Sequence, residues 1–284
     1  MKNLIPSRQM MAICTAALGF VLGPSLAAQS ANDYLSTGRD RANLGDLDGA
    51  IAEYSKAIGL DAGNAVAFNC RGLAKCNQGN FEGAIADFTQ VSRLKPGFAE
   101  AYYNRGTAEF LEGNLDGAIA SNSTAIKLRP DHQGAYFHRA LAESGETNFQ
   151  GAFADFEKAR QLQSGSGAAG TEYLGLHEAL AARRMGHAVD EHLAAGVGTN
   201  DWKKALAQFL SNQLSEAALM SHAVMADAEE QKVRQQSEAL YFSGVIRLLN
   251  GNKAGARANL KECVAISGPT SVVRRLAQTE LDRM

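Results

Sequence analysis

An excess of positive charge is missing from this 284-residue chain, which has 28 lysines and arginines against 30 aspartates and glutamates. Proteins that bind DNA, RNA or an anionic membrane surface usually carry a basic patch or stripe. The formal net charge of −2 provides no such footprint. The composition therefore predicts no nucleic-acid partner and no attachment to an anionic membrane surface.

The motifs of common enzyme classes are also missing. There is no HExxH pair, no GxSxG, no P-loop and no GxGxxG with a flanking strand. The densest histidine pair, His187 and His192, is five residues apart, about 140° around a helix, which favours surface positions over a metal site. We predict no catalytic residue, no metal site and no cofactor. A metal-dependent enzyme using His177, His187 and His192 remains the least favoured alternative.

The apolar run near the start is short. Residues 10–22 fall below the roughly 20 apolar residues that a membrane-spanning helix needs. Lys2 and Arg8 precede this run and small residues follow it, which is the order of an export signal. We predict a signal peptide at 1–27, cleavage near Ala27/Ala28 and a periplasmic mature chain without stable membrane insertion. An uncleaved anchor is the alternative.

Cysteine is scarce, with three residues left after the signal. Cys70 and Cys76 would lie about 240° apart around one expected helix, so a disulfide between them would distort it. Cys263 occupies a small packing position of a late repeat, which favours a buried thiol. An odd number leaves at least one thiol free or bonded to another chain in an oxidising compartment, so the redox state of all three stays open.

What the sequence does have is a period of 34 residues. Four related segments repeat it: GDLDGAIAEYSKAIGL (45–60), GNFEGAIADFTQVSRL (79–94), GNLDGAIASNSTAIKL (113–128) and TNFQGAFADFEKARQL (147–162). In the helix before each segment an aromatic residue recurs, with a small residue four positions later. The aromatic residues are Tyr34, Phe68, Tyr102 and Tyr136, and the small ones are Gly38, Gly72, Gly106 and Ala140. Self-similarity at this period predicts an array of paired helices that pack closely at the small residues.

At these residues the chain resembles the tetratricopeptide repeat (TPR) family. The resemblance implies four tandem repeats within residues 28–166, at about 31–64, 65–98, 99–132 and 133–166. The third repeat departs from the pattern, because Asn122 replaces the bulky residue found at Tyr54, Phe88 and Phe156. We therefore expect an all-α, TPR-type α-solenoid of helix-turn-helix repeats.

The strict period fails after the fourth repeat and returns near the end. Residues 167–236 read as an irregular helical section, and 237–284 as a fifth TPR-like repeat plus a capping helix. The chain is loosely similar to the exported TPR proteins of proteobacteria related to the lipoprotein NlpI. The residues that carry this resemblance are Trp202 and residues 209–219, 238–260 and 274–281. That resemblance implies a non-catalytic adaptor or scaffold for protein or peptide partners, with an envelope protease or a cell-wall hydrolase as candidates. An assembly factor for secretion or polysaccharide machinery is the alternative, and a homodimer is left open.

The first helices of such an array line a concave groove. The positions of the template that face it are Asn32, Leu35, Arg39, Ala42; Val66, Asn69, Leu73, Cys76; Glu100, Tyr103, Thr107, Phe110; and Gly134, Phe137, Leu141, Ser144. We select Asn69, Tyr103, Phe110 and Phe137 as the partner-binding groove, because aromatic anchors suit a bound peptide. The alternative is that the three aromatic residues only pack against neighbouring helices.

Three arginines also follow the period, at Arg71, Arg105 and Arg139. They could form a basic ladder for acidic partners, or each could pair with an acid of the same stack. Asp87 and Asp155 recur on the second helices, with Ser121 breaking the series. Because the guanidinium fork suits a carboxylate, we favour internal pairing.

Overall fold

The computed structural model describes residues 30–162, 174–187, 189 and 201–284, and none of these residues forms a strand. The first eight helices are α1 (Ala31–Asn43), α2 (Leu47–Leu60), α3 (Ala65–Asn77), α4 (Phe81–Leu94), α5 (Ala99–Glu112), α6 (Leu115–Leu128), α7 (Gln133–Gly145) and α8 (Phe149–Gln161). The others are α9 (Leu174–Arg184), α11 (Asp201–Leu210), α12 (Glu216–Ala223), α13 (Glu229–Leu249), α14 (Lys253–Ile266) and α15 (Val272–Asp282). The all-α prediction is confirmed. The predicted signal at 1–27 lies outside the described residues.

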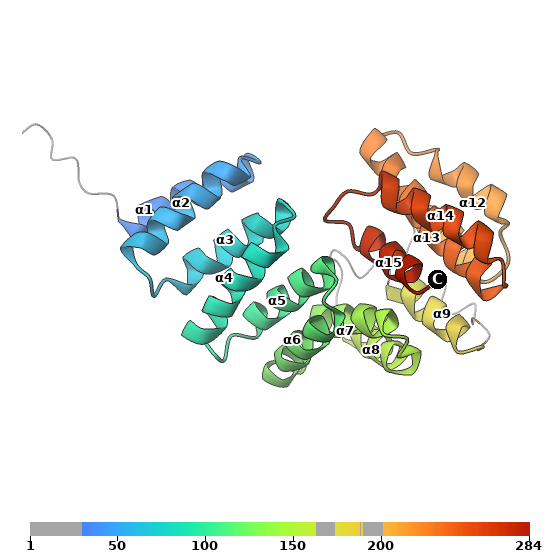
Figure 1. Cartoon of the computed structure of the whole chain (residues 1–284), viewed down its shortest axis with the longest axis horizontal. Helices are drawn as coiled ribbons and strands as arrows, with labels where there is room; N and C mark the ends of the chain where they lie inside the picture. Colours follow the sequence, from blue (N-terminus) through green and yellow to red (C-terminus); the bar gives the residue numbers. More distant parts are fainter. Residues whose placement is uncertain (1–29, 163–173, 188, 190–200) are drawn as a thin grey trace, which may run out of the picture.

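Helices α1 to α8 form four hairpins that follow one another along an arch (Figure 1). The turn inside each hairpin has a left-handed residue, Gly45, Gly79, Gly113 or Thr147, before the second helix. The residue that directly follows it is an asparagine or aspartate, which caps the second helix. The four caps are Asp46, Asn80, Asn114 and Asn148, whose side chains accept from the backbone N–H three residues on. Glycine adopts a positive φ without the Cβ clash, and the cap satisfies a backbone donor.

The two helices of a hairpin approach closely where the sequence places its small residues. A Cβ built on Gly38 would lie 2.5 Å from the Tyr54 ring, and one on Gly72 would lie 2.8 Å from the Phe88 ring. The third repeat differs, because Asn122 is fully buried opposite Gly106. Its amide donates to the Ala118 carbonyl, while its Oδ1 has no hydrogen-bond partner among the described residues. A buried polar side chain thus replaces the ring that fills this space in the other repeats.

The repeat pattern returns in α13 and α14. Asn252 caps α14 by accepting from the Gly255 N–H, and Gly251 before it has a φ of 80°. Gly244 of α13 meets Leu260 of α14, where a Cβ would lie 2.9 Å from the leucine side chain. These are the features of the hairpins in the first half of the chain. Within the described residues, no helix has both the length and the apolar character needed to cross a membrane.

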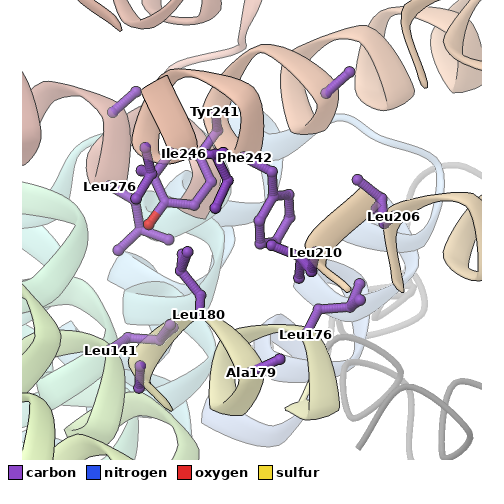
Figure 2. Packing of buried hydrophobic residues seen from close by; sticks show 14 of the residues in the cluster. Leu141, Leu176, Ala179, Leu180, Leu206, Leu210, Tyr241, Phe242, Ile246 and Leu276 are labelled. Atoms are coloured by element: carbon purple, nitrogen blue, oxygen red, sulfur yellow. The ribbon is translucent and has the colours of Figure 1, made fainter. Parts of the chain in front are cut away.

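The largest hydrophobic core joins the end of the array to the C-terminal section, by which we mean α9 and α11–α15. Figure 2 shows Leu141 of α7 near Leu180 of α9, with Tyr241, Phe242 and Leu276 above them. The first two repeats have separate, smaller clusters, one of them around Leu35, Tyr54 and Ala57. Repeats three and four therefore share their core with residues more than a hundred positions away.

Helix α15 folds back onto the array. Arg275 donates to the Leu111 carbonyl at 3.0 and 2.7 Å and to the Glu112 carbonyl at 2.9 Å, at the C-terminal end of α5. Arg283 donates to the Ser144 carbonyl at 3.4 Å, at the end of α7. Cations are favourable at helix C-termini, where carbonyls lack helical partners. Glu280 pairs with Arg184 of α9 at 2.5 Å, so α15 is fixed on two sides.

Candidate functional site: the inner surface of the repeats

The C-terminal section covers two of the four residues selected for the groove. Phe110 has 0 % exposed surface and belongs to the shared core. Phe137 is partly buried, and its ring centroid lies 5.8 Å from that of Phe156 and 6.0 Å from that of His177 on α9. In this structure the Phe137 ring packs against α8 and α9, while Phe110 lies in the shared core with its ring 6.5 Å from that of His138.

The other two residues lie nearer the first half of the array. The Tyr103 ring is partly buried, 4.7 Å from the imidazole of His132 and 5.4 Å from that of His138. Burial raises the pKa of its phenol. Asn69 accepts a hydrogen bond from the Asn104 side chain at 3.2 Å, which links α3 to α5. The structure does not bring Asn69 together with Phe110 and Phe137 in one open groove.

The exposed apolar part of the inner surface lies on α3. Val66 is 41 % exposed and Leu73 is 43 % exposed, at groove-facing positions of the second repeat. They flank Asn69 at spacings of three and four residues, so the three side chains share one helix face. Both residues stand among the groove positions in the sequence, but a choice based on aromatic anchors passes them over. Cys76 continues the face, and burial raises the pKa of its thiol to about 11, so the thiol stays protonated at neutral pH.

The recurring arginines pair inside the stack, which confirms the favoured interpretation. Arg71 donates to both carboxylate oxygens of Asp87 at 2.9 and 2.7 Å, and Arg139 contacts Asp155 in the same way at 2.6 and 2.8 Å. Each guanidinium also lies over an aromatic ring of its own helix, Phe68 or Tyr136. In the third repeat, where Ser121 replaces the acid, Arg105 donates to Ser121 and lies 3.4 Å from Glu109.

The two bidentate pairs differ in a way that predicts a difference in stability. Arg139→Ala should lower the free energy of unfolding by about 3 kcal/mol, because it leaves the buried Asp155 carboxylate without its cation. Arg71→Ala should cost less, because Lys75 remains 2.8 Å from Asp87. Urea denaturation followed by circular dichroism measures both. No loss in either variant would contradict the internal-pairing interpretation, and equal losses would show that Lys75 does not compensate for Arg71.

The metal-enzyme alternative relies on His177, His187 and His192, and the structure does not show these three histidines together. His177 is buried, His187 is exposed, and His192 lies outside the described residues. Within the described part of the chain, no three histidine, cysteine, aspartate or glutamate side chains are grouped so that they could hold a metal ion. Cys263 is buried as predicted and donates to the Ser237 carbonyl at 3.2 Å.

Hairpins stacked at a 34-residue period define an α-solenoid repeat protein. Residues 71–132 match the sequence model of the tetratricopeptide repeat, so this part of the α-solenoid consists of TPR repeats. No curated protein matches the sequence.

Solved structures show the same fold over much of the chain. A tetratricopeptide repeat protein from Parabacteroides merdae is 19 % identical, with a TM-score of 0.62 over 88 % of this chain and 98 % of that one. A structure of the MamA protein is 22 % identical, with a TM-score of 0.52 over 64 % of this chain and 92 % of that one. MamA from Desulfovibrio magneticus RS-1 is 17 % identical, with a TM-score of 0.52 over 58 % and 90 % of the two chains. TPR folds are typically scaffolds that bind proteins.

Proposed function

We propose that this chain is a non-catalytic adaptor of the bacterial periplasm, and that the open inner surface of its first repeats binds a protein or peptide. The observation that supports this most is the exposed face of α3, where Val66 and Leu73 flank Asn69. Apolar side chains with a polar group between them suit a bound helix or extended peptide. The inner side of repeats three and four is covered by this chain itself, so the open surface lies toward α1 and α3.

The mechanism is positional. A rigid, preformed surface binds without the entropic cost of ordering itself, and joining two binding sites raises the effective concentration of their ligands. The predicted export signal supports a periplasmic site of action. An envelope protease or a cell-wall hydrolase is the proposed partner, and a component of secretion or polysaccharide machinery is the second candidate. Cell fractionation of the chain with and without residues 1–27 tests the location: loss of the periplasmic pool only in the truncated chain is expected.

Capture of partners from envelope extract tests the binding surface. The double variant Val66→Asp/Leu73→Asp should reduce the amount of captured partner at least about tenfold, because charges placed at the centre of an apolar contact cannot be desolvated cheaply. Leu128→Asp is the matched control, since Leu128 is 41 % exposed but lies at the end of the second helix α6. Mass spectrometry after crosslinking identifies what is captured.

Two outcomes would count against this function. The first is that the wild-type protein captures nothing, and the second is that the double variant and the Leu128 control capture the same protein equally well. In the second case the binding surface lies elsewhere, and the adaptor role would have to rest on another face.

A further inference from the structure

A row of ring contacts runs from repeat three into the C-terminal section. Its members, in order of contact, are Tyr103, His138, Phe137, Phe156, His177, Phe242 and Tyr241, with His132 beside Tyr103 and Phe110 beside His138. The row crosses from α5 through α7 and α8 to α9 and α13. It contains two imidazoles, those of the buried His177 and the partly buried His138, among phenyl and phenol rings.

His138 meets aromatic rings on several sides. Its centroid lies 5.4 Å from Tyr103, 5.6 Å from Phe137 and 6.5 Å from Phe110, each in an edge-on arrangement. Its Nδ1 is buried and has no hydrogen-bond partner among the described residues. The titratable group that acts on the pKa of His138 is His132, and the charged groups beside His132 are Glu100 and Arg129. An imidazolium at His138 would therefore face no carboxylate of its own.

His177 is 8 % exposed and lies between the array and α13. Phe156 of α8 stacks on it at 5.9 Å, and Phe242 and Tyr241 of α13 lie at 5.6 and 6.4 Å. The charged groups around it are Arg184 of its own helix and Glu280 of α15, which line the same cavity of about 10 Å³ and pair with each other. Since that carboxylate already has Arg184, a charge on His177 would be poorly compensated.

We propose that this row is a proton-sensitive seam: protonation of His177 loosens the C-terminal section from repeats three and four, and protonation of His138 loosens α7 from α5, so that Phe137 and Phe110 are uncovered. The proposal does not depend on the adaptor function. If both hold, acidification enlarges the inner surface that a partner can reach.

The sign follows from burial, which disfavours the charged imidazole. Burial lowers the pKa of His138 and of His177 to about 4, below the value of about 6.5 in an unfolded chain. The stabilising contribution of each neutral histidine is complete above pH 6.5 and is lost as the pH falls from 6.5 toward 4. Between those values the open form binds protons that the closed form does not bind.

Two nearby carboxyls act in the opposite direction. Burial raises the pKa of Glu143 to about 7 and raises that of Glu178, so their protonation favours the folded state as the pH falls. Glu143 lies among Arg139 and Asp155, and Glu178 pairs with Arg160, whereas the seam is made of aromatic rings. A valid test must therefore follow the seam itself and not only the midpoint of global unfolding.

Hydrogen exchange of the full chain, corrected for the intrinsic rate at each pH, separates the two halves. From pH 6.5 to pH 5, peptides from α7, α9, α13 and α15 should lose protection by about tenfold per pH unit for each histidine that protonates on opening. Peptides from α2 and α4, in the first two repeats, should not change. Unchanged protection in the seam, or an equal loss in both halves, would overturn the proposal.

A double variant assigns the effect to the two imidazoles. His138→Phe/His177→Phe keeps a ring at each site without a titrating group, so its seam should lose far less protection over the same range than that of the wild type. The remaining loss would come from His132, whose pKa is also lowered by burial. His222→Gln, at an exposed histidine, should respond like the wild type. A double variant that keeps the wild-type response contradicts the proposal. If that variant does not fold, nuclear magnetic resonance titration of the wild type decides: both imidazoles must titrate well below pH 6, and values near 6.5 refute it.

Discussion

Glu280→Ala should lower the free energy of unfolding by about 3–5 kcal/mol, among the largest effects of any single substitution in this chain. Glu280 of α15 and Arg184 of α9 are joined at 2.5 Å, and their side chains are only 7 % and 8 % exposed. Removing the carboxylate leaves a guanidinium buried without its counter-ion. Arg184 also lies over the Phe149 ring, so it cannot turn to solvent without losing that contact. Urea denaturation monitored by circular dichroism measures the loss.

Two control variants separate this effect from a general loss of contacts. Arg184→Met/Glu280→Met removes both charges and should recover most of the stability, because neither charge is then left buried alone. Lys232→Ala breaks an exposed pair with Glu229 and should change stability by less than about 0.5 kcal/mol. A loss for Glu280→Ala no larger than that of Lys232→Ala would show that the pair does not hold α15 in place.

Phe88→Ala should cost about 3–5 kcal/mol, since it empties the space that the ring fills against Gly72. Phe88 is fully buried, and its cluster contains only Ala84 and Ala108 as further buried residues. Small neighbours on rigid helices cannot collapse into the cavity. Thermal and urea unfolding of the variant provide the measurement.

The third repeat supplies a matched control, because Asn122 occupies the position that Phe88 has in the second repeat. Asn122→Ala should cost roughly 1 kcal/mol, because it removes one hydrogen bond to the Ala118 carbonyl together with a carbonyl oxygen that has no partner among the described residues. A cost for Asn122→Ala equal to that of Phe88→Ala would mean that the ring contributes nothing beyond an ordinary side chain at this position.

The first half of the fold is predictable because its determinants are local and repeated. Gly72 and Phe88 lie 16 residues apart, as do Gly38 and Tyr54, so each copy of the period encodes the same hairpin. The pairing of Arg71 with Asp87 follows the same spacing. Four copies in one register define the helices, their turns and their close contacts without reference to the rest of the chain.

The inner surface could not be predicted in the same way. The bond from Arg275 to the Leu111 carbonyl joins residues 164 positions apart, and the pair of Arg184 with Glu280 spans 96. Neither contact follows the 34-residue period, so no repeat pattern in the sequence predicts it. A template derived from an array alone treats Phe110 as a groove residue, whereas the tertiary structure places it in the core that the array shares with the C-terminal section. The exposed Val66 and Leu73 were visible at groove positions, but aliphatic side chains there are ambiguous.

The return of α15 to the array has a mechanical consequence. A solenoid whose units touch only their neighbours stretches and bends like a spring, with compliance spread along its length. By linking the ends of α5 and α7 to one rigid rod, Arg275 and Arg283 remove that compliance from repeats three and four. Repeats three and four are thus held rigid by α15, and a force applied to the molecule would deform repeats one and two first.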